Sequence, residues 1–167
     1  MRIEFREPRD IHEMEAIFKL RQEVYSADAV LWKMVDDKAE LDINQYDFNA
    51  NHFGAFNKGE LIAAIRFSTA KATHQTESVK KIIKNHQIAL QAKSKRFPFE
   101  NYYPDQAACN NFIQNLAGKN IGEVGKLAIK PEYRKGFELL NQFIEAFIEY
   151  ARNDLKVDTG LAFALMP

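Results

Sequence analysis

Residues 121–151 read IGEVGKLAIKPEYRKGFELLNQFIEAFIEYA, and this stretch decides the fold. Its first nine residues, 121–129, have the apolar pattern of a strand that stops before Pro131. The basic turn at 130–137 follows, and after Gly136 apolar side chains recur at the spacing of one helical face. The members of that face are Leu140, Phe143, Ile144, Phe147, Ile148 and Ala151. The stretch therefore predicts a strand, a basic turn and a long amphipathic helix, whose free N–H groups at its start are suited to hold a phosphate.

The rest of the chain predicts further strands and helices around this stretch. The expected elements are a strand at 2–6, a helix from Ile11 to about Ser26 capped by Asp10, a loop at 27–49, strands at 52–56 and 61–68 joined by a hairpin at 57–60, helices at 75–95 and 107–117, and a final strand at 161–165. This order predicts an α/β (α+β) fold, with a mixed, mostly antiparallel sheet flanked by helices. Its length fits a single domain spanning 1–167.

Composition excludes several classes of protein. Lys and Arg equal Asp and Glu at 23 each, so the chain lacks the basic character of a dedicated nucleic-acid binder. One cysteine cannot form an intrachain disulfide or a Cys-rich zinc site, and the four histidines form no metal-binding pair, so no metal is expected. No apolar run approaches the roughly 20 residues of a membrane span, and the charged N-terminus is unlike a signal peptide. We therefore expect a cytoplasmic protein.

Three charged residues occupy positions where the pattern predicts apolar side chains. Arg21 lies on the apolar stripe of the first helix, Arg66 interrupts an apolar strand, and Glu123 shares a strand face with Ile121. Because a buried charge is costly unless it is paired, each needs a partner. Two alternatives remain: a structural ion pair with Asp42 or another of these groups, or a polar cleft that these groups share.

Gly125 lies inside the strand that carries Glu123. A glycine there favours either a bulge or simple tight packing. A bulge would shift the register and allow Glu123 and Lys126 to reach the same cleft.

The stretch 127–151 resembles the strand, phosphate turn and helix of the GNAT-like acyl-CoA N-acyltransferase superfamily. More narrowly, three blocks resemble the acyl-homoserine-lactone synthases and the N-acyl amino acid synthases. The blocks are LRQEVYSADAVLW (20–32), ELDINQYD (40–47) with LIAAIRFS (61–68), and IGEVGKLAI (121–129). Together they cover most of residues 15–165.

The resemblance assigns roles to individual residues. It implies that Glu123 is the base that acts, directly or through water, on the attacking amine. The residues implied to bind the acceptor substrate are Arg21, Trp32, Asp42, Asp47, Arg66 and Lys126. Those implied to bind the acyl donor are Leu127, Ile129 and the stretch between them, with Arg134, Lys135 and Gly136 receiving the phosphate of the donor's arm.

The chain departs from the homoserine-lactone synthases at several points. Lys126 stands where they have an arginine, the two aspartates are five apart rather than three, and the turn lacks a second glycine. These changes count more against S-adenosylmethionine as a substrate than against acyl transfer. The chain also ends one strand after the long helix, so we expect the last strands of the superfamily's sheet to be missing or supplied by a partner.

The resemblance implies an N-acyltransferase that moves a fatty acyl group from acyl carrier protein or coenzyme A to the amine of an amino acid or similar small acceptor. Both donors are co-substrates, and no tightly bound cofactor is expected. Two alternatives stay open: a non-catalytic acyl-thioester or protein-binding module, and an ordinary acetyl-CoA-dependent N-acetyltransferase. The sequence leaves open the acceptor, the acyl length and the choice of donor.

Overall fold

The computed structural model describes residues 3–28, 31, 35–36, 38–90, 95–102 and 104–162. Its sheet has five strands in the order β1-β2-β3-β4-β5. The strands are β1 (Ile3–Arg6), β2 (Ala50–Asn57), β3 (Glu60–Thr69), β4 (Ile121–Ile129) and β5 (Thr159–Ala162). All neighbours pair antiparallel except β4 and β5, which are parallel. The prediction of a mixed, mostly antiparallel sheet is confirmed.

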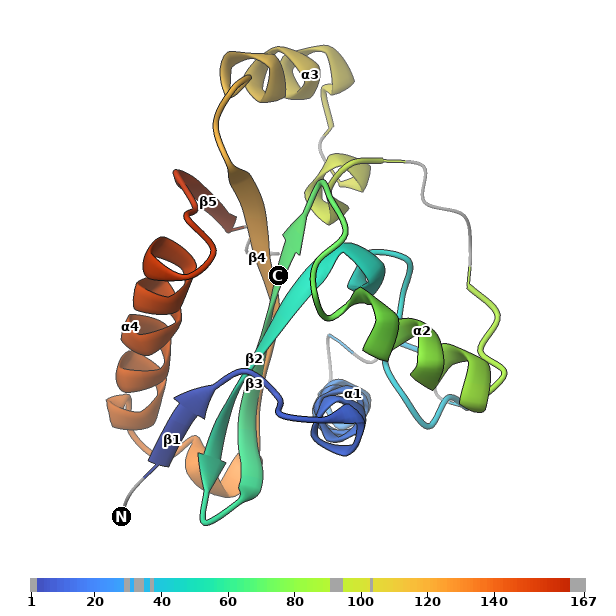
Figure 1. The fold of residues 1–167 in the computed structure, drawn as a ribbon, viewed down its shortest axis with the longest axis vertical. Helices are drawn as coiled ribbons and strands as arrows, with labels where there is room; N and C mark the ends of the chain where they lie inside the picture. The colour runs from blue at the N-terminus through green and yellow to red at the C-terminus, as the bar shows by residue number, and fades with distance from the viewer. Residues whose placement is uncertain are drawn as a thin grey trace.

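Helices cover both faces of the sheet (Figure 1). On one face lie α1 (Ile11–Ser26) and α2 (Thr76–Asn85), and on the other lies α4 (Glu138–Asn153). The helix α3 (Gln106–Asn115) projects beyond the end of the sheet. Three short 3-10 turns complete the described elements: η2 (Asp47–Asn49), η3 (Pro98–Asn101) and η4 (Pro131–Tyr133). None of the helices in the described ranges is long and apolar enough to cross a bilayer.

The two faces of the sheet have separate apolar cores. On the α1 side, Tyr25 packs with Phe56 and Ala128. On the α4 side, Phe53 and Phe67 pack with the long helix. Apart from the register shifts, alternate residues of the central strands face different helices, which explains why these strands are apolar on both faces.

The predicted ends of several elements agree with the structure. Asp10 caps α1 by accepting hydrogen bonds from the backbone N–H groups of His12 and Glu13, each at 2.9 Å. The β2–β3 hairpin turns at Lys58 and Gly59, whose φ angles of 52° and 84° are both positive. Two positive φ angles are what a two-residue hairpin loop needs to match the strand twist.

The helix predicted over 75–95 ends early, at Asn85. Gln87 adopts a φ of 53°, and its N–H donates to the carbonyl of Lys84 while the N–H of Ile88 donates to that of Ile83. This is a Schellman ending, which glycine usually marks, so the residue types around Gln87 contain no stop signal. The predicted strand at 161–165 is β5, which begins earlier, at Thr159; residues 163–167 lie outside the described residues.

The strand β4 contains a bulge. Ala64 of β3 pairs with Ala128 and Arg66 pairs with Gly125, so Lys126 and Leu127 together oppose the single residue between Ala64 and Arg66. Of the two alternatives for Gly125, the structure has the bulge, and a Cβ at Gly125 would meet nothing within 4 Å. The residue in the left-handed conformation is Lys126, with a φ of 55°. The extra residue turns Lys126 toward α1, the side of the sheet on which Arg66 and Glu123 also lie.

Candidate active site

Arg21 forms the centre of a buried ion network. Its side chain is fully buried in the middle of α1, and its Nε donates to Asp42 Oδ2 at 2.9 Å. Its Nη1 donates to Asp47 Oδ1 at 2.8 Å, and Asp47 is also fully buried. Both carboxylates come from the segment between α1 and β2, so one guanidinium fixes that segment against the helix.

Arg66 joins the same network from β3. Its Nη1 lies 3.3 Å from Asp47 Oδ1 and 3.0 Å from Asn44 Oδ1. The backbone N–H of Asn44 in turn donates to Asp47 Oδ2 at 2.8 Å. Arg21 and Arg66 are therefore paired with carboxylates, as buried charges require, and both reach Asp47.

Lys126 completes the network from the β4 bulge. Its Nζ lies 2.9 Å from Asp42 Oδ2 and 4.9 Å from the centre of the Tyr25 ring. The hydroxyl of Tyr25 donates to the carbonyl of Leu127 at 3.1 Å. We call Arg21, Asp42, Asp47, Arg66 and Lys126 the ion network; its three cations outnumber its two carboxylates.

Charge and burial oppose each other in this network. Burial alone would raise the pKa of Asp42 and Asp47, but the neighbouring cations outweigh it and hold each pKa below its usual value. Burial lowers the pKa of Lys126 to about 8, although Asp42 opposes the shift. Burial also lowers the pKa of His52 to about 3, so this histidine is neutral at 3.8 Å from Asp47.

Glu123 lies beside this network without a direct ion pair to it. The side chain is 6 % exposed, and its Oε2 accepts a hydrogen bond from the backbone N–H of Phe99 at 2.9 Å. Burial raises the pKa of Glu123 above its ordinary value, while this hydrogen bond and the charge of Arg66 oppose the rise. A buried carboxylate with a raised pKa is suited to accept a proton.

A pocket of about 290 Å³ lies between the end of β4, the end of α1 and the start of α4. We call it the β4–α4 pocket. Its lining is Val24, Tyr25, Asp28, Leu31, Leu127, Ile129, Tyr133, Arg134, Gly136, Phe137 and Leu140. Four of the predicted donor-binding residues are among them, and Lys135 is not. Tyr25 both lines this pocket and contacts Lys126, so the pocket adjoins the ion network.

The turn before α4 has uncapped backbone N–H groups that favour an anion, but its arginine is already hydrogen-bonded and a carboxylate lies close by. Gly136 has a φ of 83°, and Phe137 at the N-cap provides no side-chain cap to the first N–H groups of α4. Unsatisfied N–H groups at a helix start favour a bound anion. Arg134, however, donates from Nε to the carbonyl of Ile129 at 2.9 Å, and Glu138 puts a carboxylate in the first turn.

Sequence reasoning missed three residues that shape the site. Tyr25 fits the apolar stripe of its helix and has no further signal, yet it connects the pocket with the network. Asn44 and Phe99 act through a side-chain oxygen and a backbone N–H, which no spacing rule reveals. Trp32 lies outside the described residues. No three His, Cys, Asp or Glu side chains within the described ranges are arranged to hold a metal ion.

Several solved structures with a similar fold are acyl- or acetyltransferases of low sequence identity. FeeM, an N-acyl amino acid synthase from uncultured soil microbes, has 17 % identity and a TM-score of 0.56 over 96 % of this chain and 70 % of its own. The AHL synthase LasI has 17 % identity and a TM-score of 0.52 over the same shares of the two chains. A ribosomal-protein-alanine N-acetyltransferase from Brucella melitensis biovar Abortus 2308 has 12 % identity and a TM-score of 0.51 over 99 % of this chain and 81 % of its own. These similarities show that the chain has the GNAT fold.

A search of curated proteins found no match. A family model, by contrast, matches residues 16–164, nearly the whole chain, and is described as N-acyl amino acid synthase FeeM. The match includes α1 from residue 16 onward, the bulged strand β4 and α4, and so covers the ion network and the β4–α4 pocket. The chain therefore belongs to the FeeM family of N-acyl amino acid synthases and is an acyltransferase.

Proposed function

We propose that this protein transfers a fatty acyl group from a thioester, carried by acyl carrier protein or coenzyme A, to the amine of an amino acid or a similar small acceptor. One observation carries the proposal: the bulge in β4 places the β4–α4 pocket directly beside the ion network. A pocket suited to an acyl donor and a polar site suited to a charged acceptor thus meet at Lys126 and Leu127.

The β4–α4 pocket supports the donor side of the proposal. Its lining is mainly apolar, with Leu127 and Phe137 exposed at 38 % and 75 %. An apolar lining suits an acyl chain and the stem of a carrier arm, and the start of α4 with Arg134 suits a phosphate. The donor's phosphate would displace Arg134 from the carbonyl of Ile129, a contact at the exposed surface.

The ion network supports the acceptor side. Its excess of one positive charge attracts a carboxylate. Lys126, with a side chain 15 % exposed, is the member of the network that contacts Tyr25 of the β4–α4 pocket. The same excess disfavours an ammonium group, so an approaching amine loses its proton more readily. Arg21 and Asp47 are fully buried, and their role in this scheme is to hold Asp42 and Lys126 in place.

The reaction forms the amide bond as the amine nitrogen attacks the thioester carbonyl and the thiolate leaves. Glu123 would take the proton that the amine gives up, and its raised pKa suits that role. The backbone N–H groups around Gly125 to Leu127 would stabilise the oxyanion, because the register shift leaves two residues of β4 opposite one of β3.

The experiment offers the purified protein acyl carrier protein or coenzyme A thioesters of several chain lengths, together with a mixture of amino acids and simple amines. Mass spectrometry of the products identifies both the acyl group and the acceptor. We expect an N-acyl amino acid from long-chain donors. Products only from acetyl-CoA would favour an N-acetyltransferase, and the absence of any amide with either donor would indicate a binding module.

A further inference from the structure

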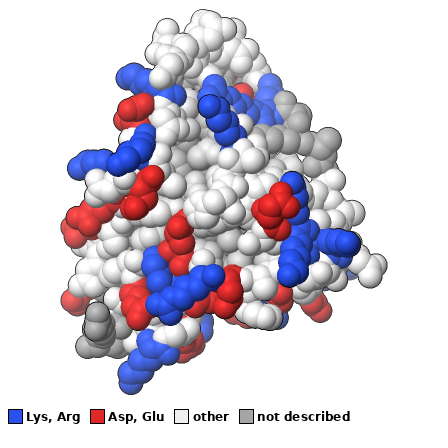
Figure 2. Space-filling view, viewed as in Figure 1, with Lys and Arg blue, Asp and Glu red and all other residues white. Residues whose placement is uncertain are grey.

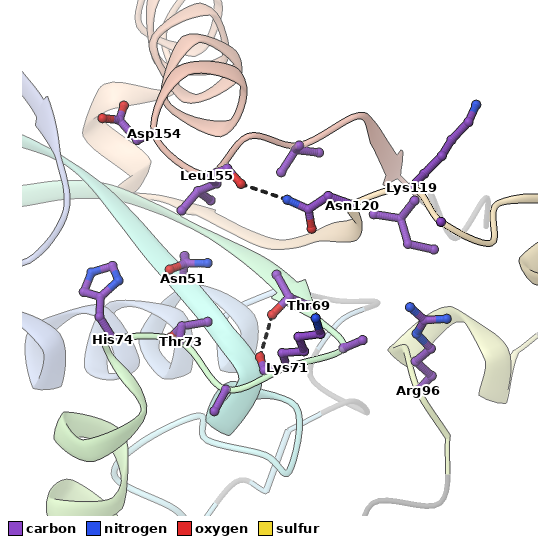
Figure 3. Close-up of a pocket in the computed structure, with 15 residues that line it drawn as sticks. Asn51, Thr69, Lys71, Thr73, His74, Arg96, Lys119, Asn120, Asp154 and Leu155 are labelled. Carbon is purple, nitrogen blue, oxygen red and sulfur yellow. Dashed lines mark hydrogen bonds between the residues drawn. The ribbon is translucent and has the colours of Figure 1, made fainter.

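A second, larger cavity of about 710 Å³ lies at the end of the sheet where β3 stops and β4 starts. We call it the polar cavity (Figure 3). Its floor includes Asn51 of β2, and its walls come from the segments 69–74, 118–121 and 154–157, with Arg96 at one side. Asn51 precedes His52, which contacts Phe18 of α1, so Asn51 is on the opposite face of the sheet. The polar cavity is therefore separated by the sheet from the ion network.

Positive charge predominates around the polar cavity. Lys71, Arg96 and Lys119 line it, all three are exposed, and none forms an ion pair with a carboxylate of the described residues. The acidic residue in its lining is Asp154, and His74 is paired with Glu7 at 3.0 Å. Three unpaired cations around one cavity favour a ligand with more than one negative charge.

The floor of the cavity holds an unsatisfied polar group. Asn51 is only 3 % exposed, and its Oδ1 has no hydrogen-bond partner. Its amide points into the space between the 69–74 segment and the 154–157 segment (Figure 3). Because a buried polar atom without a partner is destabilising, a ligand or water that satisfied the Asn51 amide would be favoured in this cavity.

We propose that the polar cavity binds a small phosphate ester with a hydroxylated body. Its phosphate carries close to two negative charges and three acceptor oxygens, which match the cations of Lys71, Arg96 and Lys119. The amide of Asn51, at the floor of the cavity, hydrogen-bonds a hydroxyl of its body. The cavity has the volume of a small-molecule site, typically about 300–1,000 Å³, and is too large for a bare phosphate ion. This site is independent of the proposed acyl transfer.

Calorimetric titration of the full chain tests the proposal with three probes: ribose 5-phosphate, ribose and inorganic phosphate. We expect ribose 5-phosphate to bind more tightly than either of the other two. Lys71→Gln and Lys119→Gln should each weaken its binding about tenfold, because a charge-assisted hydrogen bond is lost. Asn51→Ala should weaken the binding of ribose 5-phosphate while leaving that of inorganic phosphate unchanged.

Two control variants test whether binding occurs in the polar cavity itself. Lys58→Gln removes one exposed lysine at the β2–β3 hairpin and should leave the binding unchanged, as should Arg134→Gln in the β4–α4 pocket. Equal binding of ribose and ribose 5-phosphate, or equal losses in Lys58→Gln and Lys71→Gln, would overturn the proposal. Loss of binding in Arg134→Gln alone would overturn it too, because the ligand would then occupy the other pocket.

Discussion

Lys126 and Asp42 are 84 residues apart in sequence, and their side chains meet at 2.9 Å behind the bulge of β4. The lysine stands in the left-handed region with a φ of 55°, a conformation that a residue with a Cβ adopts at a cost. The ion pair with Asp42 and the contact with the Tyr25 ring offset that cost. The bulge is therefore held by a tertiary contact rather than by a glycine.

Substituting Lys126 separates the backbone cost from the ion pair. Lys126→Ala and Lys126→Gly both remove the ion pair, but only alanine keeps a Cβ at positive φ. We expect the glycine variant to be more stable than the alanine variant by about 1 kcal/mol, measured by urea unfolding. The matched pair is Leu127→Ala and Leu127→Gly, where glycine should be the less stable one. The same order at both positions would contradict the account of the bulge.

The stability of the fold should depend on pH through Lys126. Burial lowers the pKa of this lysine to about 8 in the folded protein, whereas in the unfolded chain it is near 10.5. Between these two values the unfolded chain binds the proton and the folded protein does not, so stability rises with pH across this window.

The comparison is between wild type and Lys126→Met. The free energy of unfolding of wild type, minus that of Lys126→Met, should increase by on the order of 1–3 kcal/mol between pH 7.5 and about 10.5. Lys58→Met is the control, because it shows how the free energy of unfolding changes with pH when an exposed lysine is removed. If wild type does not gain stability relative to Lys126→Met as the pH rises, the folded protein holds the proton at least as tightly as the unfolded chain, which contradicts the account.

A substitution at Gly136 tests whether the turn before α4 binds the acyl donor. A Cβ at its φ of 83° is strained, although nothing lies within 4 Å of the position. Gly136→Ala should therefore distort the turn and raise the KM for the acyl donor several-fold, with little change in the KM for the acceptor. Gly59→Ala is the control, since Gly59 has a φ of 84° and equally open surroundings at the hairpin. An equal effect of the two variants on KM would remove the turn from the donor site.

Charge reversal on helix α2 tests whether the acyl donor is acyl carrier protein or acyl-CoA. Lys80, Lys81 and Lys84 are exposed on it, and Figure 2 shows basic side chains gathered over this helix with acidic ones beside them. If they steer an acidic carrier protein, reversing all three to Glu slows transfer from acyl carrier protein at low salt and hardly affects acyl-CoA. Transfer rates at two salt concentrations give the answer. The same reversal at Lys58, Arg152 and Lys156 provides a control of equal charge. Equal sensitivity of both donors, or of neither, would leave α2 as ordinary surface.

Much of the fold could be predicted because local pattern decides it. The bounds of α1 follow from the cap at Asp10 and its apolar stripe, and those of β4 follow from Pro131. The end of α2 could not be predicted, because Gln87 adopts a conformation that its residue type does not favour. Local rules fail there because Ile88 packs beside Val79 and Ile82 of α2, a contact that no local pattern contains.

The charged part of the site could be predicted for a similar reason. Arg21 and Arg66 stood out because they interrupt apolar patterns, and a buried charge requires a partner. The contacts of Asn44 with Arg66 and of Tyr25 with Leu127 could not be predicted, because they depend on the tertiary fold and leave no pattern in the sequence. The roles of Glu123 and the donor turn came from the family resemblance and remain proposals.

The most direct test of the account is single-turnover acyl transfer by Glu123→Gln. Loss of the proton acceptor should lower the rate of amide formation by about 10²–10⁴-fold and leave the thermal unfolding temperature close to that of wild type. Glu100→Gln is the matched control, because Glu100 is a buried neighbour that also accepts a backbone N–H, that of Phe97, and should retain most of the rate. An unchanged rate in Glu123→Gln, with product still formed, would contradict the account and make Glu123 a structural residue.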